Sequence, residues 1–567
     1  MSSEDAARGK AARFLPWLAI VAAAAVAHLW CLGSVFYMDD ITAIRDNEGI
    51  RNGELPSGIA LVWTRLGYIA QYRLFGMSPM GFHAVNWLLH TAAACALFAF
   101  ARDFLRGKAA EGTALFAALL FAVHPLCSEI PNYARCQDLA WVTLFSLLAC
   151  WAVLRFLQGG GFWLLGPAIA AFYGATASKG PGFFHAAMMV GMVTLVSLTP
   201  EHRRNARRWA PWAGGALVLG VVALWLVGLL PKWWHYAQTN WGEPRFIGHA
   251  YTLARVFWEF AWRAVIPVKL CSDHQIAETL VKPGDGWFGI ADSGAMWAAA
   301  AMLGLTAFSL FLTWRKSTRI FGVCLFLFVA TILFRVMYVI PEFMPEYRIY
   351  PGMPWFCLGA AVLLAALWSR LPGGGSPRWV ATLILLPCIV LSARRSFVWH
   401  SPDTLCGDVL RQYPANARAI WELHDHDLHD GNWDSIIKRQ QEMWPPVFKT
   451  FLETNEKLKP ARELPTGHFA LADVACKGRY AIALAHVRGP AAGMVEIRRL
   501  EMLMRQLRMT EESHRIHWGY FRAAAADVLE QAGAYEKALE LLRTKATFGV
   551  TPDDLERLEK KIAEKNN

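Results

Sequence analysis

The stretch Phe14-LPWLAIVAAAAVAHLWCLGSV-Phe36 decides the fold class. Nearly all of its residues are apolar, and about 20 apolar residues are enough for a helix to cross the hydrocarbon core of a bilayer. The stretch is longer than the apolar part of a secretion signal and carries only a weak cleavage pattern, so we expect it to stay in the protein as an anchor. It therefore predicts a membrane-spanning helix.

Ten more apolar runs follow, and each is a candidate for a further span. Of the 567 residues, 55% are hydrophobic and 18% are charged, and the mean hydropathy is +0.27. This composition excludes a single globular domain, a secreted disulfide scaffold and a disordered chain. We predict an all-α polytopic membrane protein of about eleven transmembrane helices, the further spans lying near 82–101, 112–124, 138–157, 162–177, 183–198, 210–230, 294–313, 320–340, 352–370 and 378–392.

The charged residues are unevenly distributed and divide the chain into two domains. Residues 1–400 hold 32 basic and 20 acidic side chains, whereas residues 401–567 hold 24 and 25. We therefore predict a transmembrane domain over 1–392, with its first external loop at 37–81, and a soluble helical domain over 393–567. The surplus of basic residues in the first domain indicates membrane topology and not a nucleic-acid partner.

Clusters of basic residues between the spans predict the orientation, because cytoplasmic loops carry an excess of Lys and Arg. Every cluster falls on the cytoplasmic side if eleven spans cross and the N-terminus is inside. The C-terminal domain is then periplasmic, in what we expect to be a bacterial inner membrane. The clusters are Arg8, Lys10 and Arg13; Arg102, Arg106 and Lys108; Arg203, Arg204, Arg207 and Arg208; and Arg315, Lys316 and Arg319.

Residues 251–272 form an apolar segment that we do not count as a span. They include Arg255, Glu259, Arg263 and Lys269, and such side chains are costly in hydrocarbon. Counting the segment as a span would also move the basic residues at 315–319 to the outside. We predict an amphipathic helix in the outer membrane interface.

Three segments of the C-terminal domain share a pattern that begins with Gly431, Gly478 and Gly533. An aromatic residue follows each glycine by two positions, and a small or aliphatic residue lies three positions further on. A glycine turn between two packed helices has this pattern, and it resembles tetratricopeptide repeats, although the spacings here are irregular. The repeats predict either a concave surface for a partner or a plain helical cap on the membrane domain.

Two other patterns each have a plain alternative. The stretch from His424 to Asp430 is rich in His and Asp, yet a solvated helical face explains it better than a metal site does, because no closed set of ligands is present. Cys127 and Cys136 share one predicted loop and could pair in an oxidising compartment, but two free thiols are an equal alternative.

The strongest indication of a site follows the first span, where Asp39 and Asp40 stand side by side. Two adjacent carboxylates at a membrane surface are costly to desolvate, so a function as a general base or in metal binding is expected. The alternative is an N-terminal cap of the next helix. Side chains of adjacent residues diverge, so only one can point into a cavity, and we favour Asp40 for that position.

The acid pair is one of several motifs whose shared order resembles a known family. The chain is similar to the GT-C superfamily of polytopic glycosyltransferases, in particular the transmembrane-and-tetratricopeptide-repeat O-mannosyltransferases and their bacterial relatives. The other motifs are Gly81-Phe-His83-Ala-Val-Asn86-Trp-Leu-Leu-His90, His124-Pro-Leu-Cys-Ser-Glu129, Ser178-Lys179, Glu346-Tyr-Arg348-Ile-Tyr350, Trp399–Leu405 and Tyr413–Ala419.

This resemblance implies transfer of a sugar from a polyprenyl-phosphate carrier to an acceptor hydroxyl, with Asp39 or Asp40 as the base. The departing phosphate needs cations, and Arg135, Lys179 and Arg348 lie at the outer ends of predicted spans. For each cation the alternative is an interfacial anchor. An acceptor protein or glycan is expected at the C-terminal domain, and a Mg²⁺ or Mn²⁺ requirement is left open. Further candidates for the site are His83, His124, Glu129, Asp138, Glu346 and Tyr350, while His90, deeper in its span, is expected to be a packing residue.

The sequence also departs from the family, since Gly180-Pro181 follow the lysine where an acidic residue is usual. Two other classes of protein therefore compete with the enzyme. A catalytically inactive scaffold or assembly factor would display its repeats and tolerate replacement of both aspartates. A transporter is less favoured, because the acidic residues gather at one surface and not at mid-membrane.

Overall fold

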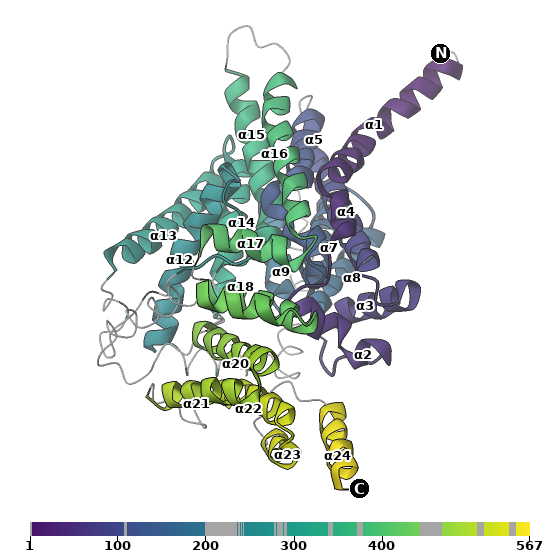
Figure 1. Cartoon of the computed structure of the whole chain (residues 1–567). Helices are drawn as coiled ribbons and strands as arrows, with labels where there is room; N and C mark the ends of the chain where they lie inside the picture. The colour runs from purple at the N-terminus through teal and green to yellow at the C-terminus, as the bar shows by residue number, and fades with distance from the viewer. Residues whose placement is uncertain are drawn as a thin grey trace. The chain divides into compact units, whose positions relative to one another are not determined.

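The computed structural model describes residues 3–59, 61–106, 110–198, 235, 239, 241, 243–276, 279, 287, 292–337, 344–370, 378–414, 416–442, 468–506, 515–543 and 552–566. Over these ranges the protein is built from helices and contains no strand, as an all-α fold requires (Figure 1). The chain forms two compact units. Unit 1 is Met1–Ser272 with Ile276–His400, and unit 2 is Asp273–Gln275 with Ser401–Asn567.

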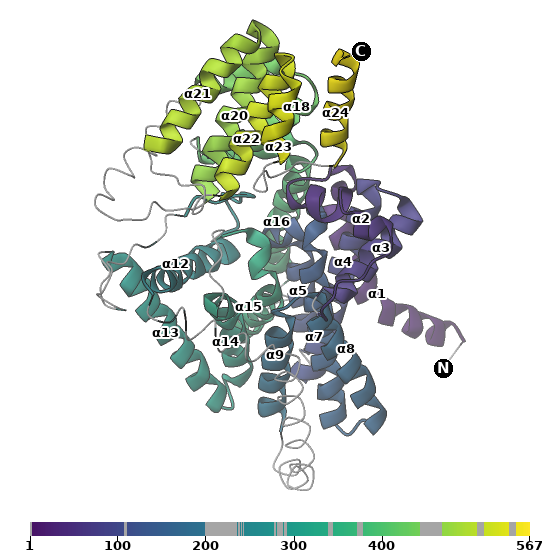
Figure 2. The same ribbon diagram turned by 90° about the horizontal axis from the view of Figure 1, so that it is seen from below.

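Unit 1 is centred on α4 (Pro79–Leu105), α5 (Ala110–Val123) and α7 (Gln137–Leu157). Small residues let these apolar helices pack closely, so that Ala93, Ala94, Ala117 and Ala118 are fully buried. Around them lie α1 (Ser3–His28), α8 (Leu165–Ser178), α9 (Gly182–Ser197), α13 (Ser293–Trp314), α14 (Arg319–Leu333), α15 (Met353–Trp368) and α16 (Arg378–Val398). Figure 2 shows α7, α8 and α9 side by side, where all three are in contact.

Apolar helices occupy ten of the eleven predicted spans, and the eleventh, 210–230, lies outside the described residues. Six of the helices are long and apolar enough to cross a membrane, and a seventh crossing exists if α5 and the bent segment Pro125–Asn132 form one broken span. Phe162–Ser178, Gly182–Ser197 and Arg319–Leu333 are shorter. The described helices therefore support a polytopic membrane protein, whereas the count of eleven remains a prediction.

The segment predicted to be amphipathic is helical from Pro244 to Val265 (α12), so the helix begins and ends earlier than the predicted 251–272. Phe257 and Phe260 are buried on one side, and Trp262 is 55% exposed on another. Arg263 pairs with Glu259 one turn earlier. The helix is therefore amphipathic. Its position in a membrane interface stays a prediction.

The predicted external loop 37–81 is largely helical and packs on the bundle. It contains a π-helical turn η2 (Ile41–Arg45), α2 (Glu48–Arg51) and α3 (Val62–Phe75). Ile44 and Ile50 are fully buried against Tyr68, Phe82 and Ala134. This small core fixes the segment that carries the acid pair onto the start of α4 and the residues before α7. The unit also contains several short helices: η1 (Leu29–Gly33), η3 (Pro125–Cys127), α6 (Glu129–Asn132), η4 (Ala134–Cys136), η5 (Phe162–Leu164), η7 (Phe334–Met337) and η8 (Glu346–Gly352).

Unit 2 consists of helical hairpins. Its helices are α17 (Pro402–Gln412), α18 (Ala417–His429), a helix over 433–442, α20 (His468–Arg488), α21 (Pro490–Gln506), α22 (Arg515–Gln531), α23 (Tyr535–Arg543) and α24 (Pro552–Asn566). Gly431 and Gly533 turn the chain at two hairpins with φ of +73° and +71°, as predicted. The small or aliphatic residues of these two patterns, Ile436 and Ala538, are fully buried.

The prediction for the third glycine is wrong. Gly478 lies inside α20, and the turn to α21 is made by Gly489 with φ of +89°. The absence of a side chain at Gly478 serves close packing instead, because a Cβ there would lie 2.8 Å from the Cβ of Ala524 in α22. Assignment of these hairpins to the tetratricopeptide family remains a proposal.

Other predictions can be placed on this fold. Helix α16 continues past the predicted domain boundary at 392, to Val398, and unit 2 resumes at Ser401. The His-rich stretch forms the second half of α18, with His424 buried and His426 beside Asp430 at 3.4 Å. Cys127 and Cys136 are both buried free thiols.

Candidate functional site

The acid pair lies directly after a residue with unusual backbone geometry. Met38 has φ of +48°, a region that non-glycine residues rarely adopt and that costs about 1–3 kcal/mol. This turn separates the two carboxylates. Asp39 is exposed, whereas Asp40 is completely buried. Strain of this kind persists where the surrounding structure holds it, and here that structure is the loop before α7.

Asp40 is bonded to backbone on both of its oxygens. Oδ1 accepts the N–H of Arg135 at 2.6 Å, and Oδ2 accepts the N–H of Tyr37 at 3.2 Å. Burial raises the pKa of Asp40 to about 8, although these N–H groups act in the opposite direction. The predicted inward aspartate is therefore buried, and both of its oxygens are bonded to backbone N–H groups. Asp39 keeps an exposed carboxylate whose charge acts on Arg135.

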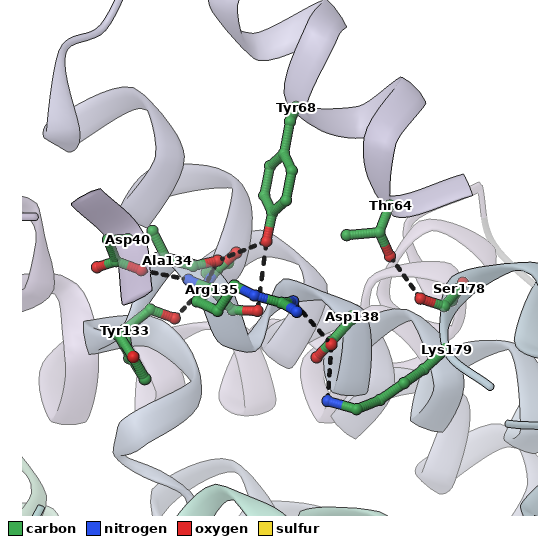
Figure 3. Close-up of polar contacts among 10 residues, drawn as sticks. Asp40, Thr64, Tyr68, Tyr133, Ala134, Arg135, Asp138, Ser178 and Lys179 are labelled. Carbon is green, nitrogen blue, oxygen red and sulfur yellow. Dashed lines mark hydrogen bonds and ion pairs between the residues drawn. The ribbon is translucent and has the colours of Figure 1, made fainter. Parts of the chain in front are cut away.

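Arg135, Asp138 and Lys179 form one ionic cluster (Figure 3). A single carboxylate oxygen of Asp138 lies 3.0 Å from Nη1 of Arg135 and 2.7 Å from Nζ of Lys179. The Asp138 side chain is 1% exposed, and each cation is 28% exposed. Two accessible cations thus share one buried anion, which leaves a net positive charge beside Asp39 and Asp40.

The third predicted cation reaches this cluster through a tyrosine. Cζ of Arg348 and Nζ of Lys179 each lie 5.8 Å from the centroid of the Tyr347 ring. The backbone N–H of Tyr347 donates to Oε2 of Glu129 at 2.7 Å, and Glu129 is 1% exposed. The structure therefore brings Arg135, Lys179 and Arg348 together, and Glu129 holds the segment that carries the last of them.

A buried amide network supports the backbone before α7. Nδ2 of Asn86 donates to the carbonyls of Ile130 and Tyr133 at 2.8 and 3.0 Å, and Nε2 of Gln137 donates to Oδ1 of Asn86 at 3.0 Å. Gln71 of α3 is bonded to Gln137 in turn. These contacts connect α3, α4 and α7 to the loop that presents Arg135, so the position of the cation is set by three helices.

Four other predicted residues are buried outside this cluster. His83 faces the carbonyl of Pro131 at 3.1 Å, and His124 faces the carbonyl of Ala264 at 2.9 Å. Oε1 of Glu346 accepts the N–H of Cys271 at 2.7 Å. The hydroxyl of Tyr350 lies 2.9 Å from Nδ1 of His90, the histidine that was predicted to be a packing residue. Their contacts are those of residues that position backbone and helices.

The described residues contain no group of three or more His, Cys, Asp or Glu side chains placed to hold a metal ion. The acid pair offers one exposed carboxylate, and the other is bonded to two N–H groups. This donor set does not fit a divalent cation, which prefers six or more oxygen ligands.

An apolar cavity of about 1050 Å³ lies along α7 and α8. One end of the cavity is lined by Trp63, Phe145 and Gly174, and the other by Arg155 and the glycines at 159–161. Gly174 is about one helical turn before Ser178 and Lys179. Thr64, next to Trp63, donates to the carbonyl of Ser178 at 2.9 Å. An apolar volume therefore begins close to the ionic cluster.

Comparison with known proteins gives a distant relative. No protein-family model matches the chain. A protein O-mannosyl-transferase of Caenorhabditis elegans is 23% identical over 447 residues, which cover 72% of this chain and 59% of the relative. The chain resembles the protein O-mannosyl-transferases. This homology supports a glycosyltransferase, and the chain matches less than two thirds of the length of that relative.

Sequence reasoning missed Tyr347 and the amide network. Tyr347 lies between Glu346 and Arg348 of one motif, and Asn86 belongs to the motif at 81–90. Both residues could therefore have been proposed from these motifs. The partners, however, come from positions more than 40 residues apart in the chain, as with Asn86 and Ile130. Contacts of this kind follow from packing and leave no local pattern.

Proposed function

We propose that this protein is an integral-membrane glycosyltransferase of the GT-C type. It moves a sugar from a polyprenyl-phosphate carrier to an acceptor hydroxyl, and protein O-mannosylation is the reaction that its relative's name favours. The observation that carries the proposal is the connection of acid pair and cations into one unit. Arg135 binds Asp40 through its backbone and Asp138 through its side chain, and Asp138 binds Lys179.

In this proposal Asp39 is the base and Asp40 fixes the loop. The acceptor oxygen attacks C1 of the sugar and gives its proton to the exposed carboxylate of Asp39. The bond from C1 to the phosphate oxygen breaks, and its electron pair leaves with the phosphate. Arg135, Lys179 and Arg348 stabilise the charge that develops there. Attack from the side opposite the phosphate inverts the configuration at C1.

The cavity along α7 and α8 supports an isoprenoid carrier, because its end at Gly174 lies about one helical turn from Lys179 and an apolar volume suits the chain of a lipid whose phosphate is bound by the cluster. We place the reaction on the periplasmic face of a bacterial inner membrane, on the basis of the basic clusters in the sequence. The helical hairpins of unit 2 are the proposed docking element for the acceptor protein or glycan.

The test is sugar transfer by the purified full-length protein in lipid nanodiscs, with radiolabelled mannose on a polyprenyl-phosphate carrier. The wild type should transfer the label, and Asp39→Asn should lower the rate by about 10²–10⁴, the usual range for loss of a general base. Asp46→Asn is the matched control, since Asp46 is exposed on the same segment and pairs with Arg45. Activity in the wild type that survives Asp39→Asn would rule out Asp39 as the base, and absence of transfer with preserved folding would favour a scaffold.

A further inference from the structure

Tyr347 lies between the two parts of the proposed reaction centre. On one side, Lys179 and Arg348 are each 5.8 Å from its ring centroid. On the other, its ring is 6.1 Å from that of Tyr133, whose hydroxyl accepts the backbone N–H of Asp39 at 3.2 Å. A sequence of contacts therefore runs from the cations through Tyr347 and Tyr133 to the acid pair.

In a glycosyl phosphate, the sugar stands between the phosphate and the attacking oxygen. If the cations bind the phosphate and Asp39 binds the acceptor proton, the residue between them contacts the sugar. Among the aromatic residues here, Tyr133 and Trp399 are 6% and 3% exposed, whereas Tyr347 is partly exposed. Of these three rings, that of Tyr347 is therefore the one that a sugar can reach.

We propose that Tyr347 is a sugar-binding and specificity-determining residue, whose ring packs against the C–H surface of the transferred sugar. The assignment rests on the proposed function. A tyrosine suits this position, because its ring offers apolar area and its hydroxyl can bond to a sugar hydroxyl. Tyr133, stacked on Trp399 with centroids 5.5 Å apart, forms a fixed wall behind it.

Glu129 is the positioning residue for Tyr347. Its buried carboxylate accepts the N–H of Tyr347 at 2.7 Å and so fixes the backbone of η8 at the point where the ring leaves it. A buried hydrogen bond of this kind would be costly to break, because the N–H group would be left without a partner. The tyrosine is thus held in place by a group that does not itself need to touch the sugar.

The experiment compares two ligands on the full-length protein in nanodiscs: polyprenyl phosphate without sugar, and the same carrier linked to mannose. Binding of both is measured for the wild type, Tyr347→Ala, Tyr347→Phe and the control Trp314→Ala, whose exposed ring lies at the end of α13. Tyr347→Ala should weaken binding of the mannose-linked ligand about tenfold more than binding of the sugar-free ligand. Tyr347→Phe keeps the flat ring and should retain more of the sugar-dependent affinity.

The outcomes separate this assignment from the function on which it rests. Equal weakening of both ligands by Tyr347→Ala would mean that the ring only holds the cations, and it would overturn the assignment. Equal loss in Tyr347→Phe and Tyr347→Ala would overturn packing of the ring on the sugar. Failure of the wild type to bind either ligand would instead refute the proposed function, and this assignment with it.

Discussion

Asp39 and Asp40 are neighbours in the chain but have opposite surroundings. A pair of carboxylates after a membrane span is visible in the sequence, and so is the expectation that their side chains diverge. Which of them faces a substrate depends on the backbone turn at Met38 and on the N–H group of Arg135, which binds Asp40 from 95 residues away. Burial alone would favour Asp40 as the base, whereas the bonds to its oxygens favour Asp39.

Asp40→Asn should change the pH dependence of stability. Because burial raises the pKa of Asp40 to about 8 in the folded protein, the stability that its protonated form contributes is present below the unfolded pKa near 4 and is lost as the pH rises through 8. Asparagine does not titrate, although one of the two N–H groups loses its acceptor. Thermal unfolding of the variant and the wild type is measured from pH 5 to 9. The Tm of the variant should lie below that of the wild type by less at high pH than at low pH. A difference in Tm that grows with pH would contradict the raised pKa of Asp40.

Lys179→Ala and Arg348→Ala should weaken binding of the donor. Loss of a charge-assisted contact to phosphate costs about 1.5–3 kcal/mol, or roughly ten- to a hundredfold in donor KM or kcat/KM. Arg315→Ala is the control, since Arg315 follows α13 and lies over the ring of Phe311. Kinetics are measured with circular dichroism in parallel, because Lys179 also pairs with Asp138. Unchanged kinetics in both variants would assign the cations to interfacial anchoring.

At the scale of the elements, apolar composition predicted most of the long helices of unit 1, but not the residues at which they begin and end. Runs such as 82–101 and 294–313 became α4 and α13 with ends shifted by a few residues, because burial in lipid or protein requires an unbroken apolar helix. The helical character of α2 and α3, and the turn at Gly489, were not predicted. The stability of α2 and α3 comes from partners such as Phe82 and Ala134, and those contacts form only in the folded chain.

Gly478→Ala tests the revised role of this glycine. A Cβ at Gly478 would meet the Cβ of Ala524 at 2.8 Å, so α20 and α22 must separate, and overpacking of this kind costs about 1–3 kcal/mol. Gly407→Ala is the matched control, since that helical glycine of α17 has no atom within 4 Å of an added Cβ, and alanine should stabilise it by about 0.5–1 kcal/mol. Chemical denaturation of both variants gives the comparison. A neutral Gly478→Ala would show that the helices adjust freely.

At the scale of the whole molecule, the candidate site and the basic residues Arg102 and Arg155 occupy opposite ends of the same helices. Arg135 stands before α7, while Arg155 lies in its last turn; Asn86 is near the start of α4, while Arg102 is in its last turn. Lys179 follows α8 and Arg348 precedes α15, so these two also belong to the end that carries the acid pair. Basic residues favour the cytoplasmic side, and the site is therefore expected on the other side.

This arrangement predicts the topology in a form that can be measured at two points of unit 1 and one of unit 2. A cysteine introduced at Asp46, exposed beside the acid pair, should react in intact cells with a membrane-impermeant maleimide, whereas one at Ser317, in the turn between α13 and α14, should react only after permeabilisation. Background labelling should be low, because ten of the eleven native cysteines are buried.

An alkaline-phosphatase fusion after Asn567 should be active, since eleven crossings place unit 2 outside. If the cysteine at position 46 is labelled but the fusion is inactive, the site has the predicted orientation and the count of eleven spans is wrong. If only the cysteine at position 317 is labelled in intact cells, the orientation of the whole protein is the reverse of the prediction, and the proposed reaction would take place in the cytoplasm.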